Sequence, residues 1–220
     1  MIKNVLEINN LSKKYEKFEL KNINLKIPEG SILGLIGQNG AGKSTIIKSI
    51  MNIIPYDSGS IKINGNNVNI KNEISIKEEI GYVGEHLDFY PDVKLRQIYK
   101  FTCKFYRNWD ESLFNRLIEI FNIDIDKKIK ELSKGMVVKF SLAMALSHRP
   151  KFLLLDEPTS GLDPVIRSEL LDILSEEVKS RKCSILFSSH ITEDIIKIAD
   201  TVAFIDNGEI KLVENKEKIL

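Results

Sequence analysis

The sequence predicts an α/β fold in which a parallel central sheet carries an antiparallel β edge and an inserted all-helical lobe. Two short apolar runs, residues 31–36 and 152–155, are typical of strands buried on both faces of a sheet. A glycine-rich loop and then a helical pattern follow the first run, which is the strand–loop–helix order of an α/β unit. Between the two runs the apolar residues recur at helical spacing, which predicts the inserted lobe.

Strands are expected near both ends of the chain, where apolar and polar residues alternate or short apolar runs occur. The predicted strands are residues 5–8, 23–27, 61–63, 185–187, 202–205 and 209–213. A turn at 28–30 precedes the buried run 31–36. Asn-Gly pairs at 64–65 and 207–208 predict tight hairpins, and the second pair joins the last two strands.

Helices are expected after the glycine-rich loop, throughout the middle of the chain, and after Asp163. The first two helices of the middle region are indicated by residues that recur at helical spacing, namely Leu95, Ile98, Thr102 and Phe105, then Leu113, Leu117, Ile118 and Phe121. Asp110 is placed to cap the second of these helices, and a third begins near Ser133. Asp163 can cap a further helix, and Pro164 suits the first position of that helix.

These elements fit one domain over residues 1–220. Residues 1–84 and 151–220 form the sheet core with its antiparallel β lobe, and residues 85–150 form the helical insertion. The chain is long enough for one well-buried core, and it shows neither an internal repeat nor a low-complexity segment.

The composition is that of a soluble globular protein. Hydrophobic residues make up 43% and charged residues 29%, and the formal net charge is +1. Nucleic acid or anionic lipid is therefore not attracted by the chain as a whole, and any anion binding needs a local site. No apolar run approaches the ~18–20 residues that span a bilayer, and the first residues do not read as a secretory signal. Cys103 and Cys183 are expected to be reduced thiols of a cytosolic protein, with a disulfide as the alternative.

The most specific motif lies between the predicted strand at 31–36 and the helix that follows it. It matches the pattern G-x-x-x-x-G-K-[ST] of a phosphate-binding P-loop, which predicts a P-loop NTPase core. Glycines let backbone amides turn toward phosphate oxygens, the helix start adds a positive dipole end, and the lysine reaches the β/γ-phosphates. The predicted ATP-binding residues here are Gly37, Gln38, Asn39, Gly40, Ala41, Gly42, Lys43, Ser44 and Thr45, with the Ser44 hydroxyl as a Mg²⁺ ligand.

Two acidic residues end the second buried run. Asp156 and Glu157 follow residues 152–155, so a rigid strand delivers both carboxylates to the mouth of the sheet. Asp156 is predicted to hold the water shell of Mg²⁺, and Glu157 to orient the attacking water. The alternative is a pair of surface charges at a strand end, which the neighbouring P-loop disfavours.

A third motif is Leu-Ser-Lys-Gly-Met at 132–136, just ahead of a helix. Ser133 and the amides near Gly135 can form an anion site at the helix start. The local pattern by itself favours a simple helix cap.

Taken in order, these segments resemble the nucleotide-binding subunit of ABC (ATP-binding cassette) transporters. The resemblance rests on the P-loop, residues 132–136, Asp156-Glu157, the Ser-Gly-Leu-Asp segment 160–163 and His190, and it covers nearly the whole chain. It implies a head-to-tail dimer with a second cassette, either an identical chain or a close homologue, in which the signature residues of one subunit meet the ATP on its partner's P-loop. The residues that would make this contact are Ser133, Lys134, Gly135 and Met136.

The resemblance also assigns roles to single residues. Asp163 is expected at the dimer seam, beside its capping role. His190 is expected to contact the γ-phosphate and position the water with Glu157, and Tyr15 to stack on adenine; a half-exposed strand tyrosine is the alternative for Tyr15. His86 and His148 match nothing catalytic and are expected at the surface.

Three positions depart from the family pattern. Glu85 stands where the family usually has a glutamine that touches Mg²⁺ or its water, so here a full negative charge is expected beside the metal. In the signature, Lys134 replaces the commonest glycine and Met136 the commonest glutamine. Since Ser133 and Gly135 remain, function is expected to survive. Lys134 either adds a charge near the phosphates or is simply solvated.

The resemblance implies an ATPase that uses ATP and Mg²⁺ and energises a separate integral membrane permease. We expect it at the cytoplasmic face of the cell membrane, more in keeping with an exporter of drugs, peptides or lipids than with an importer. Two rivals are considered. A soluble cassette protein acting on ribosomes or DNA would tend to carry two cassettes and a basic surplus, so no nucleic-acid partner is expected. A small-molecule kinase would leave residues 132–136, Asp163 and His190 without a use.

Overall fold

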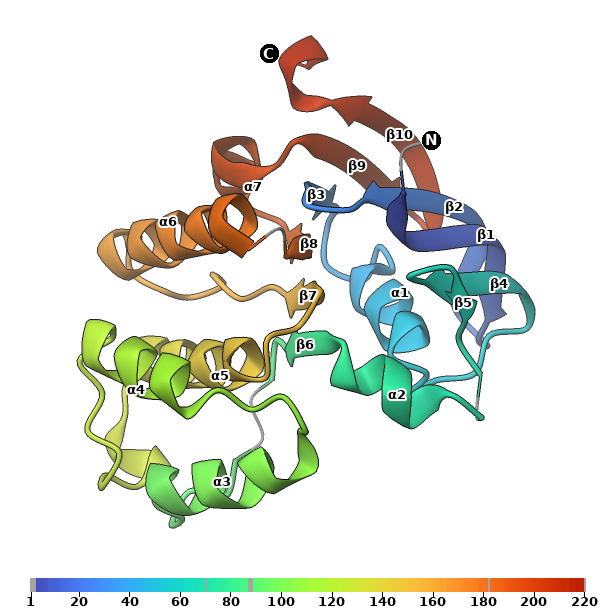
Figure 1. Cartoon of the computed structure of the whole chain (residues 1–220). Coiled ribbons are helices and arrows are strands. Elements are labelled where there is room, and N and C mark those ends of the chain that lie inside the picture. The colour runs from blue at the N-terminus through green and yellow to red at the C-terminus, as the bar shows by residue number, and fades with distance from the viewer. Residues whose placement is uncertain (1–2, 70, 87–88, 182, 220) are drawn as a thin grey trace.

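The computed structural model describes residues 3–69, 71–86, 89–181 and 183–219 (Figure 1). The strands are β1 (Asn4–Lys14), β2 (Glu19–Pro28), β3 (Ile32–Ile36), β4 (Ser58–Ile63), β5 (Asn66–Asn67), β6 (Ile80–Val83), β7 (Phe152–Asp156), β8 (Ser184–Ser189), β9 (Thr201–Asp206) and β10 (Glu209–Asn215). The α-helices are α1 (Lys43–Ile50), α2 (Glu73–Glu78), α3 (Leu95–Thr102), α4 (Glu111–Ile120), α5 (Lys134–Ser147), α6 (Pro164–Arg181) and α7 (Thr192–Ile198). Short 3₁₀ turns follow at Cys103–Phe105, Ile129–Glu131 and Lys216–Lys218.

The strands form two sheets, as the fold class predicts. The central sheet has the order β10-β9-β3-β8-β7-β6, and all its pairs are parallel except the hairpin of β9 with β10. The second sheet is antiparallel, with the order β2-β1-β4-β5. The predicted parallel core with an antiparallel β edge is therefore confirmed.

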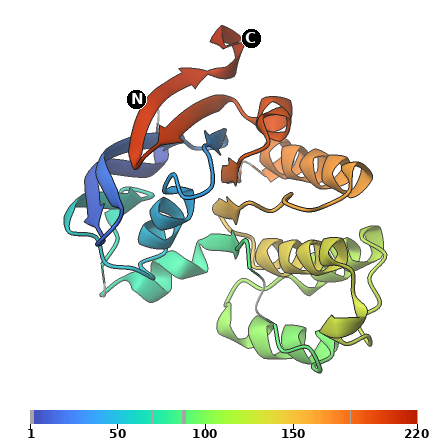
Figure 2. The same cartoon turned by 180° about the vertical axis from the view of Figure 1, so that it is seen from behind.

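Successive side chains of the central strands point to opposite faces of the sheet, and both faces are covered. Leu33 and Leu35 of β3 pack with α1 and the antiparallel sheet, whereas Ile32 and Ile36 face the other layer. That other layer contains α4, α5, α6 and α7 (Figures 1 and 2). Burial on both faces explains why the central strands read as continuous apolar runs.

Helices α3, α4 and α5 lie between β6 and β7 in the chain and make up a helical region beneath the sheet in Figure 1. The expected caps are present: the Asp110 carboxylate accepts the Leu113 N–H at 3.0 Å, and the Ser133 hydroxyl accepts the Met136 N–H at 3.3 Å. Among the described residues, no helix combines the length and the apolar character that a bilayer crossing requires.

The prediction for His148 is wrong. This residue is 3% exposed, not at the surface. Its ring stacks on Tyr106 with centroids 4.0 Å apart, and its Nε2 lies 3.0 Å from the Ile80 carbonyl oxygen. Burial lowers the pKa of His148, because the charged imidazolium loses its hydration. His86, in contrast, is exposed as expected.

Candidate nucleotide-binding and catalytic site

The candidate residues gather at one edge of the central sheet. Strands β6, β7, β8 and β3 are neighbours and run parallel, so their carboxyl ends lie together. Glu85 follows β6, Asp156 ends β7 and precedes Glu157, His190 follows β8, and the P-loop follows β3. The carboxyl edge of parallel strands is where ligands bind in open α/β sheets, so topology alone concentrates these side chains at one place.

The P-loop contains glycines in backbone conformations that other residues adopt only with strain. Gly40 and Gly42 have φ of 82° and 115°. A Cβ at Gly42 would lie 2.9 Å from the Phe18 ring and 2.6 Å from the Leu20 side chain. Helix α1 starts immediately afterward at Lys43, so its unpaired amides and positive dipole end face the loop. This is the geometry of an anion cradle.

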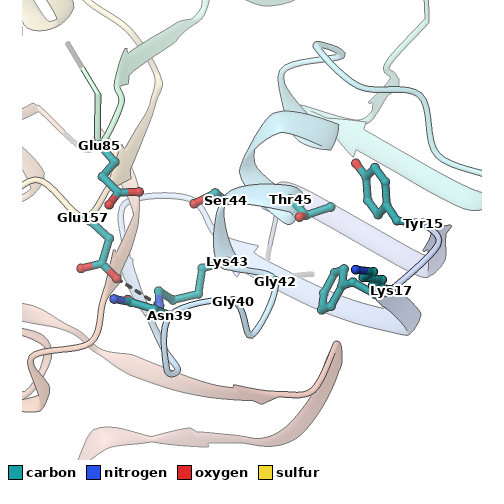
Figure 3. A pocket seen from close by; sticks show the side chains of 11 residues that line it. Tyr15, Lys17, Asn39, Gly40, Gly42, Lys43, Ser44, Thr45, Glu85 and Glu157 are labelled. Carbon is teal, nitrogen blue, oxygen red and sulfur yellow. Dashed lines mark ion pairs between the residues drawn. The ribbon is translucent and has the colours of Figure 1, made fainter.

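Lys43 lies at the centre of the site and is only 5% exposed. Its ammonium group donates to the carbonyl oxygens of Gly37 and Gln38 at 2.6 and 3.1 Å. The same group forms an ion pair of 3.0 Å with Glu157 Oε1 (Figure 3). An incoming phosphate must therefore compete with a buried carboxylate for this charge.

Glu157 connects three parts of the site. Its second carboxylate oxygen lies 2.7 Å from His190 Nδ1 and accepts the His190 N–H at 3.3 Å. The backbone of Glu157 has φ of 52°, which is uncommon for a residue with a side chain. Such strain persists when surrounding contacts hold it in place, and it is concentrated at functional sites.

Asp156 is 2% exposed, and the Ser188 hydroxyl donates to its Oδ1 at 2.8 Å. Burial raises the pKa of Asp156. The hydroxyls of Ser44 and Ser188 act against this rise, and the charges of Glu85 and Glu157 reinforce it. A cation bound here would remove the cost of the buried charge. The oxygen atoms of Asp156, Glu85 and Ser44 are the kind of ligand that Mg²⁺ prefers.

Ser188 is a site residue that sequence reasoning missed. Its hydroxyl also accepts the Glu157 N–H at 3.1 Å, so one side chain holds both neighbouring acids. The available signal was a small polar residue near the end of the strand that precedes His190. That signal is common in strands and becomes informative only once β8 is known to pair with β7.

A cavity of about 650 Å³ runs along the P-loop. One end is lined by Tyr15 and Lys17, the middle by residues of the P-loop, and the other end by Glu85 and Glu157 (Figure 3). Phe18 also lines the cavity, beside Tyr15. The Tyr15 side chain is 42% exposed, with its ring centroid 6.5 Å from that of Phe18. An aromatic end, a cationic middle and an acidic end match the base, phosphates and metal of a nucleotide. Lys17 and Phe18 are additions that the sequence did not single out.

The signature residues are not among those that line this cavity. Ser133 caps α5, while Gly135 is buried so closely that a Cβ there would lie 2.9 Å from Ile166. The Lys134 side chain lies over Gly161, whose Cβ position is 3.1 Å from Lys134 Nζ. Asp163 caps α6 by accepting the amides of Val165 and Ile166 at 3.1 and 3.0 Å. Within one chain, Ser133, Lys134 and Asp163 are exposed but do not line the nucleotide cavity.

Fold and site together define a P-loop ATPase in which a strand-end aspartate and glutamate face the phosphate loop. The ABC transporter family model matches residues 20–160, more than half of the chain, and the protein belongs to this family. It is thus an ATP-binding ABC subunit with ATPase activity.

Individual relatives agree with this assignment. The chain is 34% identical over 216 residues to the ABC transporter ATP-binding protein YtrB of Bacillus subtilis, covering 98% of this chain and 73% of that protein. It is 36% identical over 210 residues to the lantibiotic transport ATP-binding protein SrtF of Streptococcus pyogenes, covering 94% and 90%. The solved structure of cbiO1 from Clostridium perfringens, part of the ABC transporter complex cbiONQ, is similar with a TM-score of 0.84 and 25% identity, covering 99% of this chain and 90% of that one.

Proposed function

We propose that this ATPase works as a head-to-tail pair of cassettes and energises export through a separate membrane permease at the cytoplasmic face of the cell membrane. The observation that carries the pairing is that the sequence motifs lie in two separate places on one chain. The cavity is lined by residues of the P-loop, Glu85 and Glu157, but Ser133 to Met136 do not line it. A second copy, turned head to tail, would bring these donors to the exposed side of the phosphates.

Each site residue then has a role. The P-loop amides and Lys43 bind the phosphates, and Tyr15 stacks on the base. Glu157 holds the attacking water, and His190 Nδ1, 2.7 Å from its carboxylate, keeps the carboxylate in place when Lys43 binds the phosphates. His190, with a side chain 43% exposed, can reach toward the γ-phosphate. Asp163 lies at the seam in addition to capping α6.

Ser44, Asp156 and Glu85 would hold Mg²⁺. The ion would neutralise charge on the β- and γ-phosphate oxygens during phosphoryl transfer. These residues position their oxygens from α1, β7 and the segment after β6, so the chain supplies a rigid platform. Catalysis by the remaining groups is then positioning and electrostatic stabilisation.

Replacing Glu85 with glutamine should shift the Mg²⁺ dependence of ATP hydrolysis. The substitution removes one negative charge that acts on Asp156, and it also reduces repulsion of a triphosphate when the metal is scarce. We therefore expect turnover to continue with an altered half-saturating Mg²⁺ concentration. Glu131→Gln, outside the cavity, is the control. Superimposable Mg²⁺ titrations of Glu85→Gln and the parent chain would refute the role given to Glu85.

The permease is proposed to seat in a second cavity of about 350 Å³ between the core and the helical region. Tyr82, Gly84 and His86 line its core side, and Ile98 and Thr102 of α3 line the other. Glu85 lies between Gly84 and His86. The segment that lines the second cavity therefore also contributes a residue to the nucleotide site. A role in transport is supported by similarity to SrtF, which is named for lantibiotic transport.

Affinity purification of the tagged chain from detergent-solubilised native membranes tests this proposal. We expect a polytopic membrane protein in stoichiometric amount, identified by mass spectrometry. Recovery of the chain with ribosomal or DNA-associated proteins, and without a membrane protein, would leave the ATPase assignment intact and contradict the transport role.

A further inference from the structure

The segment 94–107, which contains α3, has an unusual charge for this protein. It contains five basic residues and no acidic residue, although the whole chain has 32 basic and 31 acidic residues. The basic residues are Lys94, Arg96, Lys100, Lys104 and Arg107. The remainder of the chain consequently carries an excess of acid. This segment is a local basic site on a nearly neutral protein.

Helix α3 and the 3₁₀ turn after it have two different faces. Leu95 is fully buried, and Ile98 and Tyr99 pack against the helical region. The opposite face carries Phe101 and Phe105, which are 65% and 64% exposed. Their ring centroids are 5.0 Å apart, so the two rings form one apolar patch. A contiguous exposed apolar patch rimmed by polar residues is a candidate contact surface.

Two lysines flank this aromatic pair. Lys100 and Lys104 are exposed and spaced one helical turn apart, as are the two phenylalanines. By comparison, Arg96 pairs with Asp126 at 2.6 Å and Arg107 with Glu78 at 3.4 Å. Within the described part of the chain, no ion pair involves Lys100 or Lys104. Their charges are therefore available to an external anion.

We propose that this outer face, Lys100, Phe101, Lys104 and Phe105, contacts the anionic surface of a lipid bilayer. Aromatic rings enter the boundary between headgroups and acyl chains, while neighbouring lysines attract anionic headgroups. Figures 1 and 2 place α3 at the end of the molecule opposite β10 and the C-terminus, so the face can approach a plane without obstruction from them.

A loop of the permease is the other occupant to consider. Ile98 and Thr102 of α3 line the second cavity, where the permease is proposed to bind. Lys100, Phe101, Lys104 and Phe105 do not line it. The outer face of α3 therefore lies outside the second cavity. A membrane-embedded partner seated in that cavity would bring the bilayer surface close to α3, which is the one step that rests on the proposed function.

Vesicle co-sedimentation of the purified chain tests the proposal directly. We expect binding to phosphatidylcholine vesicles that contain phosphatidylglycerol, little binding to phosphatidylcholine alone, and loss of binding when ionic strength rises from about 0.05 to about 0.5 M. Lys100→Gln/Lys104→Gln should weaken binding about 25-fold, at about fivefold for each basic residue. Phe101→Ser/Phe105→Ser should weaken it about tenfold or more.

The chain offers matched controls on other surfaces. Lys26→Gln/Lys179→Gln removes two exposed lysines, and Leu212→Ser/Val213→Ser removes two exposed apolar side chains of β10. Both controls should bind vesicles as the parent does.

Absence of binding to phosphatidylglycerol vesicles, or equal losses in test and control variants, would overturn the proposal. Unchanged vesicle binding of the α3 variants with reduced permease recovery would overturn it too, and would assign the face to the permease. ATP turnover of the purified chain is a separate readout, so a negative vesicle result leaves the proposed function standing.

Discussion

Replacing Glu157 with glutamine is expected to lower ATP turnover by about 100-fold or more, the range for loss of a positioned general base. ATP binding should remain, since the P-loop amides and Lys43 are unchanged. Glutamine keeps the size of the side chain but cannot accept a proton from water as a carboxylate does. Steady-state phosphate release and nucleotide binding, measured on the same preparation, separate the two effects.

The control for this substitution is Glu169→Gln. Glu169 also pairs with a lysine, Lys139 at 2.7 Å, but lies on α6 away from the nucleotide cavity. Its replacement should leave turnover close to that of the parent. Near-normal turnover in Glu157→Gln would show that another group activates the water and would contradict the account of the site.

Replacing Lys43 with alanine is expected to weaken ATP binding by about 100-fold or more, because a charge-assisted contact to the phosphates is lost from a buried position. The same change should destabilise the nucleotide-free chain. Glu157, 6% exposed, would lose its cationic partner, and breaking a buried pair costs about 3 kcal/mol or more.

The double variant Lys43→Ala/Glu157→Gln distinguishes the two consequences. Removing the carboxylate's charge should restore much of the lost thermal stability, while ATP binding stays weak. Thermal unfolding without nucleotide and equilibrium ATP binding are the measurements. If the single Lys43→Ala variant has the melting temperature of the parent and binds ATP as tightly, the ion pair does not stabilise the chain and the phosphate contact does not strengthen ATP binding.

The sequence predicted the parts of this site that depend on local pattern. The P-loop, the acids at the end of β7 and the Asp110, Ser133 and Asp163 caps follow from short motifs whose physics is contained in a few residues. Short elements were missed, namely α2, β6 and α7, because four to seven residues carry too little periodicity.

Contacts between distant parts of the chain were beyond sequence reasoning. The Ser188 contacts with both acids and the Lys43–Glu157 pair depend on the order of β3, β8 and β7 in the sheet. The error over His148 has the same origin. His148 lies in a turn, where a polar residue is expected to be exposed. Tyr106, which lies between α3 and α4 in the chain, stacks on its ring.

The central claim is that each ATP site is completed by a second chain. Light scattering of Glu157→Gln, with and without ATP, tests it most directly, because this variant is expected to bind ATP and to hydrolyse it too slowly to release the dimer. We predict that ATP doubles the molar mass and that adding Ser133→Arg, in a chain whose circular dichroism shows it to be folded, keeps the mass at that of one chain. A Glu157→Gln chain that is saturated with ATP and still has the mass of one chain would contradict the account.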